Sequence, residues 1–321
     1  MIFSSKVPSN INAPLPLVEY LTNRFTYYDQ TAWNEKITEG CIRIDGVVAA
    51  PIDTVFRGQT ISYDAGEFEE PPADCTISII YEDSWLLAVN KPGNLLIHRA
   101  GKSFRNNLMY QLRTVHTPPY PSAQSVHRLD RNTSGVVLIA QTADFASKLN
   151  RLFLSQNIHK TYIAIVHGIP SPSIESIIYP ISKDFTYSTA PKFRIDTAGK
   201  KAISQIELCT PLGSAFSKLT LTPHTGRTHQ LRVHCAAIGH PIVGDKLYGS
   251  NYDISTPLFS NNETGQQLPQ YCRHALHCYR LSFMHPWLKT RCTITAPIPE
   301  DIQQLEEYLL KDKKKGRYAP L

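Results

Sequence analysis

The sequence predicts a protein of mixed helix and strand content, divided into a small N-terminal part and a larger second part. Several segments alternate apolar and polar residues, as strands do, and between them apolar residues recur at helical intervals. Residues 65–75 are acidic, contain two consecutive prolines and have no periodicity, which is typical of a linker. We therefore expect domains at residues 1–64 and 76–321. The 321 residues, 42% of them hydrophobic, can bury a substantial core.

The first domain is predicted to contain two helices followed by strands. Residues 19–25 and 29–39 favour helices, and residues 41–48 favour two strands joined by a tight turn. The turn is predicted at Asp45-Gly46, because this dipeptide between alternating residues is a strong hairpin signal. Residues 58–63 would form a closing strand.

The second domain is predicted to open with two strands, at residues 76–81 and 85–90. The second strand ends in the sequence NKPG, which by itself indicates only a turn. Apolar residues at helical intervals then predict an amphipathic helix over residues 103–116, with Ser103 as its N-cap.

The most informative stretch is HRLDRNTSG, residues 127–135, which precedes the apolar strand at 136–140. An acid between two arginines, closed by turn-forming residues and joined to a rigid strand, is typical of a reactive loop. Surface ion pairing is the commoner fate of a single acid in a charged run, so Asp130 alone decides nothing. A helix capped by Thr142 should follow and end near Leu154.

Residues 160–168 form a further strand-like run that contains Tyr162. A tyrosine in such a strand usually packs against the core. Residues 171–200 are polar and irregular, and we expect an insertion or a long hairpin there. Strands are predicted again at residues 203–208 and 218–222.

A second dense stretch, HTGRTHQLRVHCAAIGHPIVGD, covers residues 224–245. Thr228 is placed to cap a helix that Gly239 would end. Taken alone, its arginines Arg227 and Arg232 would be expected to contact phosphate or solvent. A last helix is predicted over residues 299–311, followed by a basic tail.

Charge is distributed unevenly along the chain. Residues 1–64 have a net charge of −2 and the linker −4, so the rest of this +6 chain has +12. A polyanionic partner would therefore bind mainly to residues 76–321. No apolar run is long enough to span a membrane, and seven scattered cysteines without a signal pattern favour the cytoplasm.

Two groups of histidines and cysteines raise the possibility of a metal site. Neither contains the closely spaced ligand pairs of common zinc motifs, so we expect no metal. Gly101-Lys102-Ser103 also lacks the earlier glycine of a nucleotide-binding loop. The members of the two groups are His224, His229, His234 and Cys235, then Cys272, His274, His277 and Cys278.

Four motifs in this order resemble those of the RluA-type pseudouridine synthases. They are NKPG at residues 90–93 with His98 after it, HRLD followed by TSG at 127–135, K-x-Y at 160–162, and GRTHQLR at 226–232. The resemblance implies an α+β fold with a mixed, mainly antiparallel sheet, flanking helices and a central cleft. The first domain is similar to the αL module of ribosomal-protein type that often precedes this catalytic domain. Because the module is acidic here, RNA binding and a purely packing role both stay open.

The resemblance also implies a reaction and a set of residues. Uridine in a folded RNA would be isomerised to pseudouridine, which requires no cofactor. Asp130 would attack or deprotonate the nucleotide, Arg232 would pair with this carboxylate and keep it ionised, and Tyr162 would stack on the uracil. The expected substrate-binding residues are Arg128, which would fill the gap left by the flipped uridine, Lys91 and Arg227, which would contact phosphate, and His127, Lys160 and Gln230.

The expected partner is structured RNA, with large-subunit ribosomal RNA favoured over transfer RNA. We expect a cytoplasmic monomer that binds no membrane. A non-catalytic RNA-binding factor of ribosome assembly is the alternative from another class, and it would not require Asp130. A base deaminase is disfavoured, because the sequence lacks the H-x-E and P-C-x-x-C zinc signature.

Overall fold

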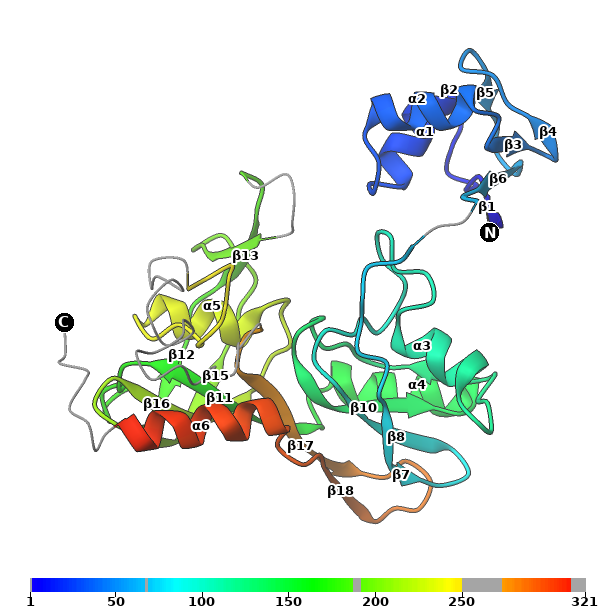
Figure 1. Cartoon of the computed structure of the whole chain (residues 1–321). Coiled ribbons are helices and arrows are strands. Elements are labelled where there is room, and N and C mark those ends of the chain that lie inside the picture. The colour runs from blue at the N-terminus through cyan, green and yellow to red at the C-terminus, as the bar shows by residue number, and fades with distance from the viewer. Residues whose placement is uncertain (1, 67–68, 187–191, 250–272, 313–321) are drawn as a thin grey trace. The chain divides into compact units, whose positions relative to one another are not determined.

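The computed structural model describes residues 2–66, 69–186, 192–249 and 273–312. Its chain forms two compact units (Figure 1): the first comprises Met1–Pro72 and the segment Arg99–Asn106, and the second comprises Ala73–His98 and the chain from Asn107 onward. The division after Pro72 falls inside the segment predicted to be a linker. Cys272 of the possible metal group and the predicted basic tail lie outside the described residues.

The first unit contains two helices and a four-stranded sheet in the order β1-β6-β3-β4. Asp29 caps α2 by accepting a hydrogen bond from the Ala32 N–H. Asp45 and Gly46, with φ of 49° and 89°, form the predicted turn. The elements are β1 (Ile2–Lys6), β2 (Leu15–Pro16), α1 (Leu17–Arg24), α2 (Gln30–Thr38), β3 (Ile42–Ile44), β4 (Val47–Val48), β5 (Thr54–Val55) and β6 (Thr60–Asp64).

The segment 99–106 was predicted to belong to the second domain and to begin a helix at Ser103, but it belongs to the first unit and contains no helix. The Glu70 carboxylate accepts hydrogen bonds from the backbone N–H groups of Phe104, Arg105 and Asn106. The helix predicted from Ser103 therefore begins only after these residues: α3 spans Leu108–Tyr110, and a π-helix, η1, continues over Gln111–Val115. Its cap is Asn107, whose side chain accepts from the Tyr110 N–H.

The second unit is built on a ten-stranded sheet in the order β12-β15-β16-β11-β17-β10-β8-β7, to which β18 and β9 add at β17 and β10. Every pairing in it is antiparallel except that of β10 with β17, so the predicted mixed, mainly antiparallel fold is confirmed. The strands are β7 (Ser78–Glu82), β8 (Leu86–Lys91), β9 (Gln124–Ser125), β10 (Ser134–Ala140), β11 (His159–His167), β12 (Ser176–Ile177), β15 (Ser204–Leu212), β16 (Phe216–Pro223), β17 (Leu276–Met284) and β18 (Arg291–Thr295).

Helices flank both halves of this sheet (Figure 1). α4 (Ala143–Leu154) packs on β10, and the Thr142 side chain caps it as predicted. α5 (Gln230–Ala237) and α6 (Glu300–Asp312) belong to the half around β15 and β16. Each half has its own hydrophobic cluster. No described helix has the length and apolar character needed to cross a membrane.

The two halves join where β10 runs parallel to β17. Gly135 lies at this junction with φ of 115°, and a Cβ atom there would be 2.2 Å from the Cys278 carbonyl oxygen. Only glycine allows this approach. The loop that carries Asp130 and precedes β10 is therefore held at the seam between the two halves of the sheet. The polar insertion forms the long hairpin expected, with β13 (Ile181–Asp184) paired to β14 (Lys192–Ile195).

Candidate active site

The loop that carries Asp130 is fixed by backbone hydrogen bonds on both sides. The carbonyl of Arg131 accepts from the Lys91 ammonium at 3.1 Å, and Arg273 Nη1 donates to the Asn132 carbonyl at 2.9 Å. These bonds connect the loop to β8 and to the segment before β17. The Asp130 side chain is thus presented from a rigid support.

Lys91 has a place different from the phosphate contact expected of it. Its side chain is fully buried, and its ammonium donates to the carbonyls of Pro92, Leu95 and Arg131. Burial lowers the pKa of Lys91 to about 7. In this structure all three ammonium hydrogen bonds of Lys91 are therefore made to backbone carbonyls, and the residue braces the loop from inside the protein.

A chain of three charged side chains forms the centre of the site. Arg232 Nη1 donates to Asp130 Oδ2 at 3.1 Å, while Nε and Nη2 donate to the two oxygens of Asp245 at 2.7 and 2.9 Å. The Asp245 side chain is completely buried, whereas 19% of the Asp130 side chain is exposed. Asp245 is therefore the fixed partner that aims the guanidinium, and Asp130 is the member open to a ligand.

Each charged side chain of this trio stabilises the charged form of its neighbour. Burial disfavours the charged form of Arg232, but its hydrogen bonds to Asp245 and the negative charges of both aspartates raise its pKa. Burial also opposes ionisation of Asp245, and the bonds from Arg232 overcome this and lower the pKa of the Asp245 carboxyl. Arg232 and Asp245 are consequently a charged pair at neutral pH.

His229, which the sequence indicated only as a possible metal ligand, adds a second group next to Asp130. Its Nε2 lies 3.8 Å from Asp130 Oδ2, and its Nδ1 is 2.7 Å from the Tyr248 hydroxyl. Burial lowers the pKa of His229. The residue takes the N-cap position of α5 in a left-handed conformation, φ 57°, so the prediction that Thr228 caps this helix is wrong. The helix starts one residue later than a Thr228 cap would require.

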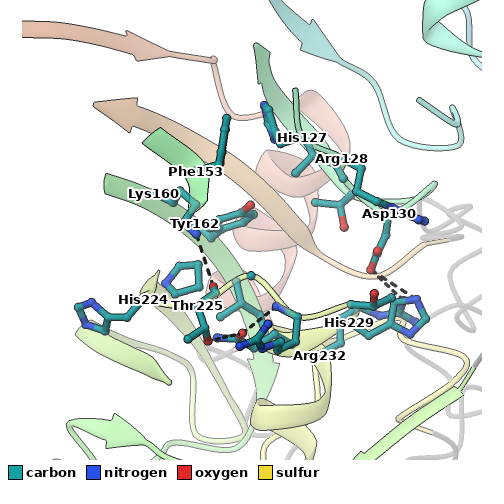
Figure 2. Close-up of a pocket in the computed structure, with 18 of the residues that line it drawn as sticks. His127, Arg128, Asp130, Phe153, Lys160, Tyr162, His224, Thr225, His229 and Arg232 are labelled. Atoms are coloured by element: carbon teal, nitrogen blue, oxygen red, sulfur yellow. Dashed lines mark hydrogen bonds and ion pairs between the residues drawn. The ribbon is translucent and has the colours of Figure 1, made fainter. Parts of the chain in front are cut away.

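These residues line a cavity of about 570 Å³. In Figure 2, Asp130 is directed toward Arg232 and His229, and Tyr162 reaches the cavity from β11. Burial raises the pKa of Tyr162 well above its usual value, so its phenol stays protonated. The structure thus brings the three residues predicted to be catalytic together around one space. A carboxylate, a guanidinium and an aromatic ring that share a cavity of this size can hold a nucleobase and its sugar.

Comparisons with known proteins agree with this site. Residues 85–237 match the family described as RNA pseudouridylate synthase. The ribosomal large subunit pseudouridine synthase D of Xylella fastidiosa is 31% identical over 91% of this chain and 88% of its own length. The chain belongs to the RluA-type RNA pseudouridine synthases.

A further sequence relative and a solved structure also resemble this synthase. The protein of the same name from Pseudomonas aeruginosa is 32% identical over 87% of each chain. The structure of human RNA pseudouridylate synthase domain containing 1 has 26% identity and a TM-score of 0.54, and covers 79% of this chain and all of its own. The synthase is therefore an isomerase that converts uridine in RNA to pseudouridine.

Two expected substrate-binding residues of the synthase make hydrogen bonds within the protein. The Nε2 atom of His127 accepts a hydrogen bond from the Leu138 N–H, and the ring stacks on Phe153 with centroids 4.7 Å apart. Burial lowers the pKa of His127 to about 3, so the ring is neutral. Lys160 donates to the Thr225 carbonyl at 3.4 Å, and burial lowers its pKa. Both side chains line the cavity.

Gln230 lines the cavity of the synthase, but its amide is occupied within the protein. Its oxygen accepts from the Thr225 hydroxyl and the Arg227 N–H, and its nitrogen donates to the Ile203 carbonyl and the Ser204 hydroxyl. Gln230 therefore shapes the loop before α5, with both polar atoms of its amide bound to protein groups. Arg227 and Arg128 line the cavity with exposed side chains.

Asp245 and Tyr248 are the functional neighbours that the sequence did not identify. Asp245 is the last residue of the stretch 224–245, but nothing in its spacing connects it to Arg232. Tyr248 packs under the Arg232 guanidinium at 5.0 Å and holds His229 through its hydroxyl.

No three His, Cys, Asp or Glu side chains of the described ranges are grouped as a metal site would require. The histidines of the two groups make hydrogen bonds to protein atoms instead. His234 binds Ser204 and the Tyr179 carbonyl, and His274 binds Thr133.

Proposed function

We propose that this synthase converts specific uridines of large-subunit ribosomal RNA to pseudouridine, with Asp130 as the catalytic carboxylate. The observation that carries the proposal is the pairing of Asp130 with Arg232 in a cavity that Tyr162 also lines. The relatives named ribosomal large subunit pseudouridine synthase D, matched over about nine-tenths of the chain, support the choice of RNA.

The reaction rearranges bonds without adding or removing atoms. The bond from uracil N1 to ribose C1′ breaks, the base turns, C5 forms the new bond to C1′, and the proton from C5 is lost while N1 gains one. Asp130 either attacks the nucleotide or removes a proton from it, and both roles need a carboxylate oxygen with a free lone pair. Arg232 and His229 both approach Oδ2, and within the described chain no hydrogen bond reaches Oδ1. We assign Oδ1 as the reactive oxygen.

Tyr162 and the exposed arginines are assigned to the nucleotide around this carboxylate. A protonated phenol ring on β11 offers a flat surface for the everted uracil and a proton donor at its edge. Arg128 is assigned to the space that the base leaves in the RNA, and Arg227 to a phosphate, because both extend exposed guanidinium groups from the cavity wall.

The remaining assignments concern the whole protein. We take the first unit to be the αL-type module, whose net charge of −2 over residues 1–64 favours a packing role over phosphate binding. One chain supplies Asp130, Tyr162 and Arg232, which supports action as a monomer. We place the enzyme in the cytoplasm, because the relatives named for ribosomal RNA come from bacteria, which make that RNA in the cytoplasm.

The test is Asp130→Asn, a change that keeps the shape of the side chain and removes its negative charge, so that the side chain can neither attack as a carboxylate nor accept a proton. Pseudouridine formation on a ribosomal RNA fragment should fall to background, while the Kd for that RNA stays within about threefold, because Asp130 contributes no positive charge to RNA binding. Turnover retained by this variant would refute the assignment.

The RNA target is tested separately in cells. Pseudouridines are mapped in RNA from cells with and without the gene. Sites should disappear from large-subunit ribosomal RNA, and the loss of transfer RNA sites alone would overturn the proposed target.

A further inference from the structure

A second cavity adjoins the catalytic one and has no role in the reaction described above. Its volume is about 310 Å³, and its lining includes Lys160, His224, Gln156 and Pro223, which also line the first cavity. The two cavities are therefore adjacent and share part of their walls. In Figure 2, Lys160 and His224 lie at the end of the catalytic cavity away from Asp130 and His229, so the second cavity extends the first in the direction away from the reacting carboxylate.

The second cavity is formed where neighbouring strands begin or end on one edge of the sheet. β11 begins there with His159 and Lys160, and the antiparallel β16 ends there at Pro223. β17 ends and β18 begins on its other side, with Met284 paired to Arg291. The lining is thus supported by four hydrogen-bonded strands, and it does not depend on a single loop.

The lining is basic. It contains the cations Lys160 and Arg291 and the imidazoles His159 and His224, and none of its described members is a carboxylate. Glu207, on β15 and outside the lining, lies 3.9 Å from His159, and its carboxylate also accepts a hydrogen bond from the Thr222 hydroxyl. Positive charge therefore remains mainly at Lys160 and Arg291.

The Arg291 guanidinium is held in one orientation and remains exposed to solvent. Its Nε donates to the Ser282 hydroxyl at 3.2 Å, which fixes the plane of the guanidinium on the sheet edge, and the side chain is exposed. A guanidinium that is anchored at Nε and solvated at its other nitrogens suits bidentate binding of a phosphate. Phe283 is the only Phe, Tyr or Trp among the described lining residues and is itself buried, so the groups that this cavity exposes are mainly cations and imidazoles.

We propose that the second cavity binds the phosphodiester backbone of the RNA strand next to the target uridine, with Arg291 as its main contact. This inference rests on the proposed function, since it requires that the uridine occupies the cavity beside Asp130. A strand whose target base enters that cavity continues past Lys160, and its next phosphates meet the groups on the sheet edge. The site thereby fixes the direction of the strand without reading its bases.

The test measures how RNA affinity depends on salt. The full-length protein binds a fluorescent ribosomal RNA fragment that contains the target uridine, and Kd is measured between about 50 and 300 mM salt. Loss of one phosphate contact in Arg291→Ala should make the slope of log K against log salt shallower by about 0.7 to 1, with binding about 3- to 10-fold weaker near physiological salt. Arg291→Lys keeps the charge and should recover most of the slope.

Lys148→Ala is the matched control, because Lys148 is an exposed cation on α4 of the same unit and lines neither cavity. It should leave the slope within error of wild type. An equal change of slope in both variants, or no change in Arg291→Ala, would overturn the inference. Thermal unfolding of each variant verifies that the fold is intact.

A second arm separates a backbone phosphate from a free phosphate ion. RNAs with a single uncharged methylphosphonate linkage, placed in turn on either side of the target, are bound to wild type and to Arg291→Ala. At one position the substitution should weaken wild-type binding and leave the variant unaffected. If no position does so, while inorganic phosphate competes only with wild type, the cavity binds a free anion and the inference is wrong.

The outcomes also distinguish this inference from the proposed function. Pseudouridine formed by wild type and lost in Asp130→Asn supports the function whatever Arg291→Ala does. A normal salt slope in Arg291→Ala under those conditions rejects the second cavity alone.

Discussion

Asp245→Asn is predicted to slow catalysis although Asp245 does not touch the space for the nucleotide. In the native site, Asp245 Oδ1 accepts from Arg232 Nη2 and from the N–H groups of Leu247 and Tyr248, and Oδ2 accepts from Arg232 Nε at 2.7 Å. An asparagine can keep its oxygen at the Oδ1 position and preserve the turn. Its NH₂ group then faces the Arg232 Nε–H, so a donor opposes a donor.

The expected magnitude follows from this geometry. A hydrogen bond to a charged group contributes about 1.5 to 3 kcal/mol, and breaking a fully buried ion pair costs about 3 to 5 kcal/mol. Because one of the two bonds survives, we expect the free energy of unfolding of the second unit to fall by about 3 kcal/mol. This corresponds to a lowering of Tm by about 6 to 12 °C. An Arg232 that is no longer aimed by two bonds should slow the chemical step by about 10- to 100-fold.

The assay is single-turnover conversion of a saturating RNA, followed by release of tritium from uracil C5, together with thermal unfolding of the same sample. Glu306→Gln is the control, since Glu306 forms a partly exposed ion pair with Lys218 that lies outside both cavities. This variant should lower the free energy of unfolding by about 1 kcal/mol or less and leave the single-turnover rate unchanged. A folded Asp245→Asn enzyme that converts uridine at the wild-type rate would refute the positioning role.

Three further predictions concern the rest of the second unit. Burial lowers the pKa of His277 to about 4, so the unfolded chain binds one more proton than the folded one between pH 4 and about 6.5. The free energy of unfolding should therefore fall by up to about 1.4 kcal/mol per pH unit as pH decreases through this range. His277→Gln should remove this contribution from denaturant titrations, and an unchanged pH slope would contradict it. Gly135→Ala should lower the free energy of unfolding by more than about 3 kcal/mol in thermal unfolding, because its Cβ would meet the Cys278 carbonyl. Gly239 also has a positive φ but has no atom within 4 Å of an added Cβ, so Gly239→Ala should lower it by only about 1 kcal/mol. Equal losses would reject this reason. Tyr162→Ala should lower kcat/KM by a factor equivalent to about 1 to 3 kcal/mol, because the stacking surface is lost, and Tyr162→Phe should restore that part. If the two variants lose equal activity, the hydroxyl is the group that matters.

Features that depend on neighbours in sequence were predictable. The Asp45-Gly46 turn and the Thr142 cap follow from short-range hydrogen bonding and backbone preference, and both appear where expected. The helix start at Ser103 was wrong because Glu70, more than thirty residues earlier, takes the N–H groups that a helix cap would have satisfied. The cap at Thr228 was wrong because His229 adopts a left-handed conformation.

The same distinction applies to the site. The motifs indicated Asp130, Tyr162 and Arg232, and these three line one cavity. They did not indicate that Lys91 would be buried as a brace or that Gln230 would use all of its amide hydrogen bonds within the protein. Side-chain type is visible in a sequence, but burial depends on what packs above it.

The sequence by itself determined which reactive groups this protein has and the order in which they occur, because an ordered set of motifs is a property of the chain alone. Only the tertiary structure decided which partner each group has. Asp245 aims Arg232, and Gly135 permits β10 to approach β17, because assembly of the sheet brings together segments whose spacing in the chain carries no such information. The position of the basic second cavity next to the catalytic one has the same origin, since its lining comes from the ends of four neighbouring strands.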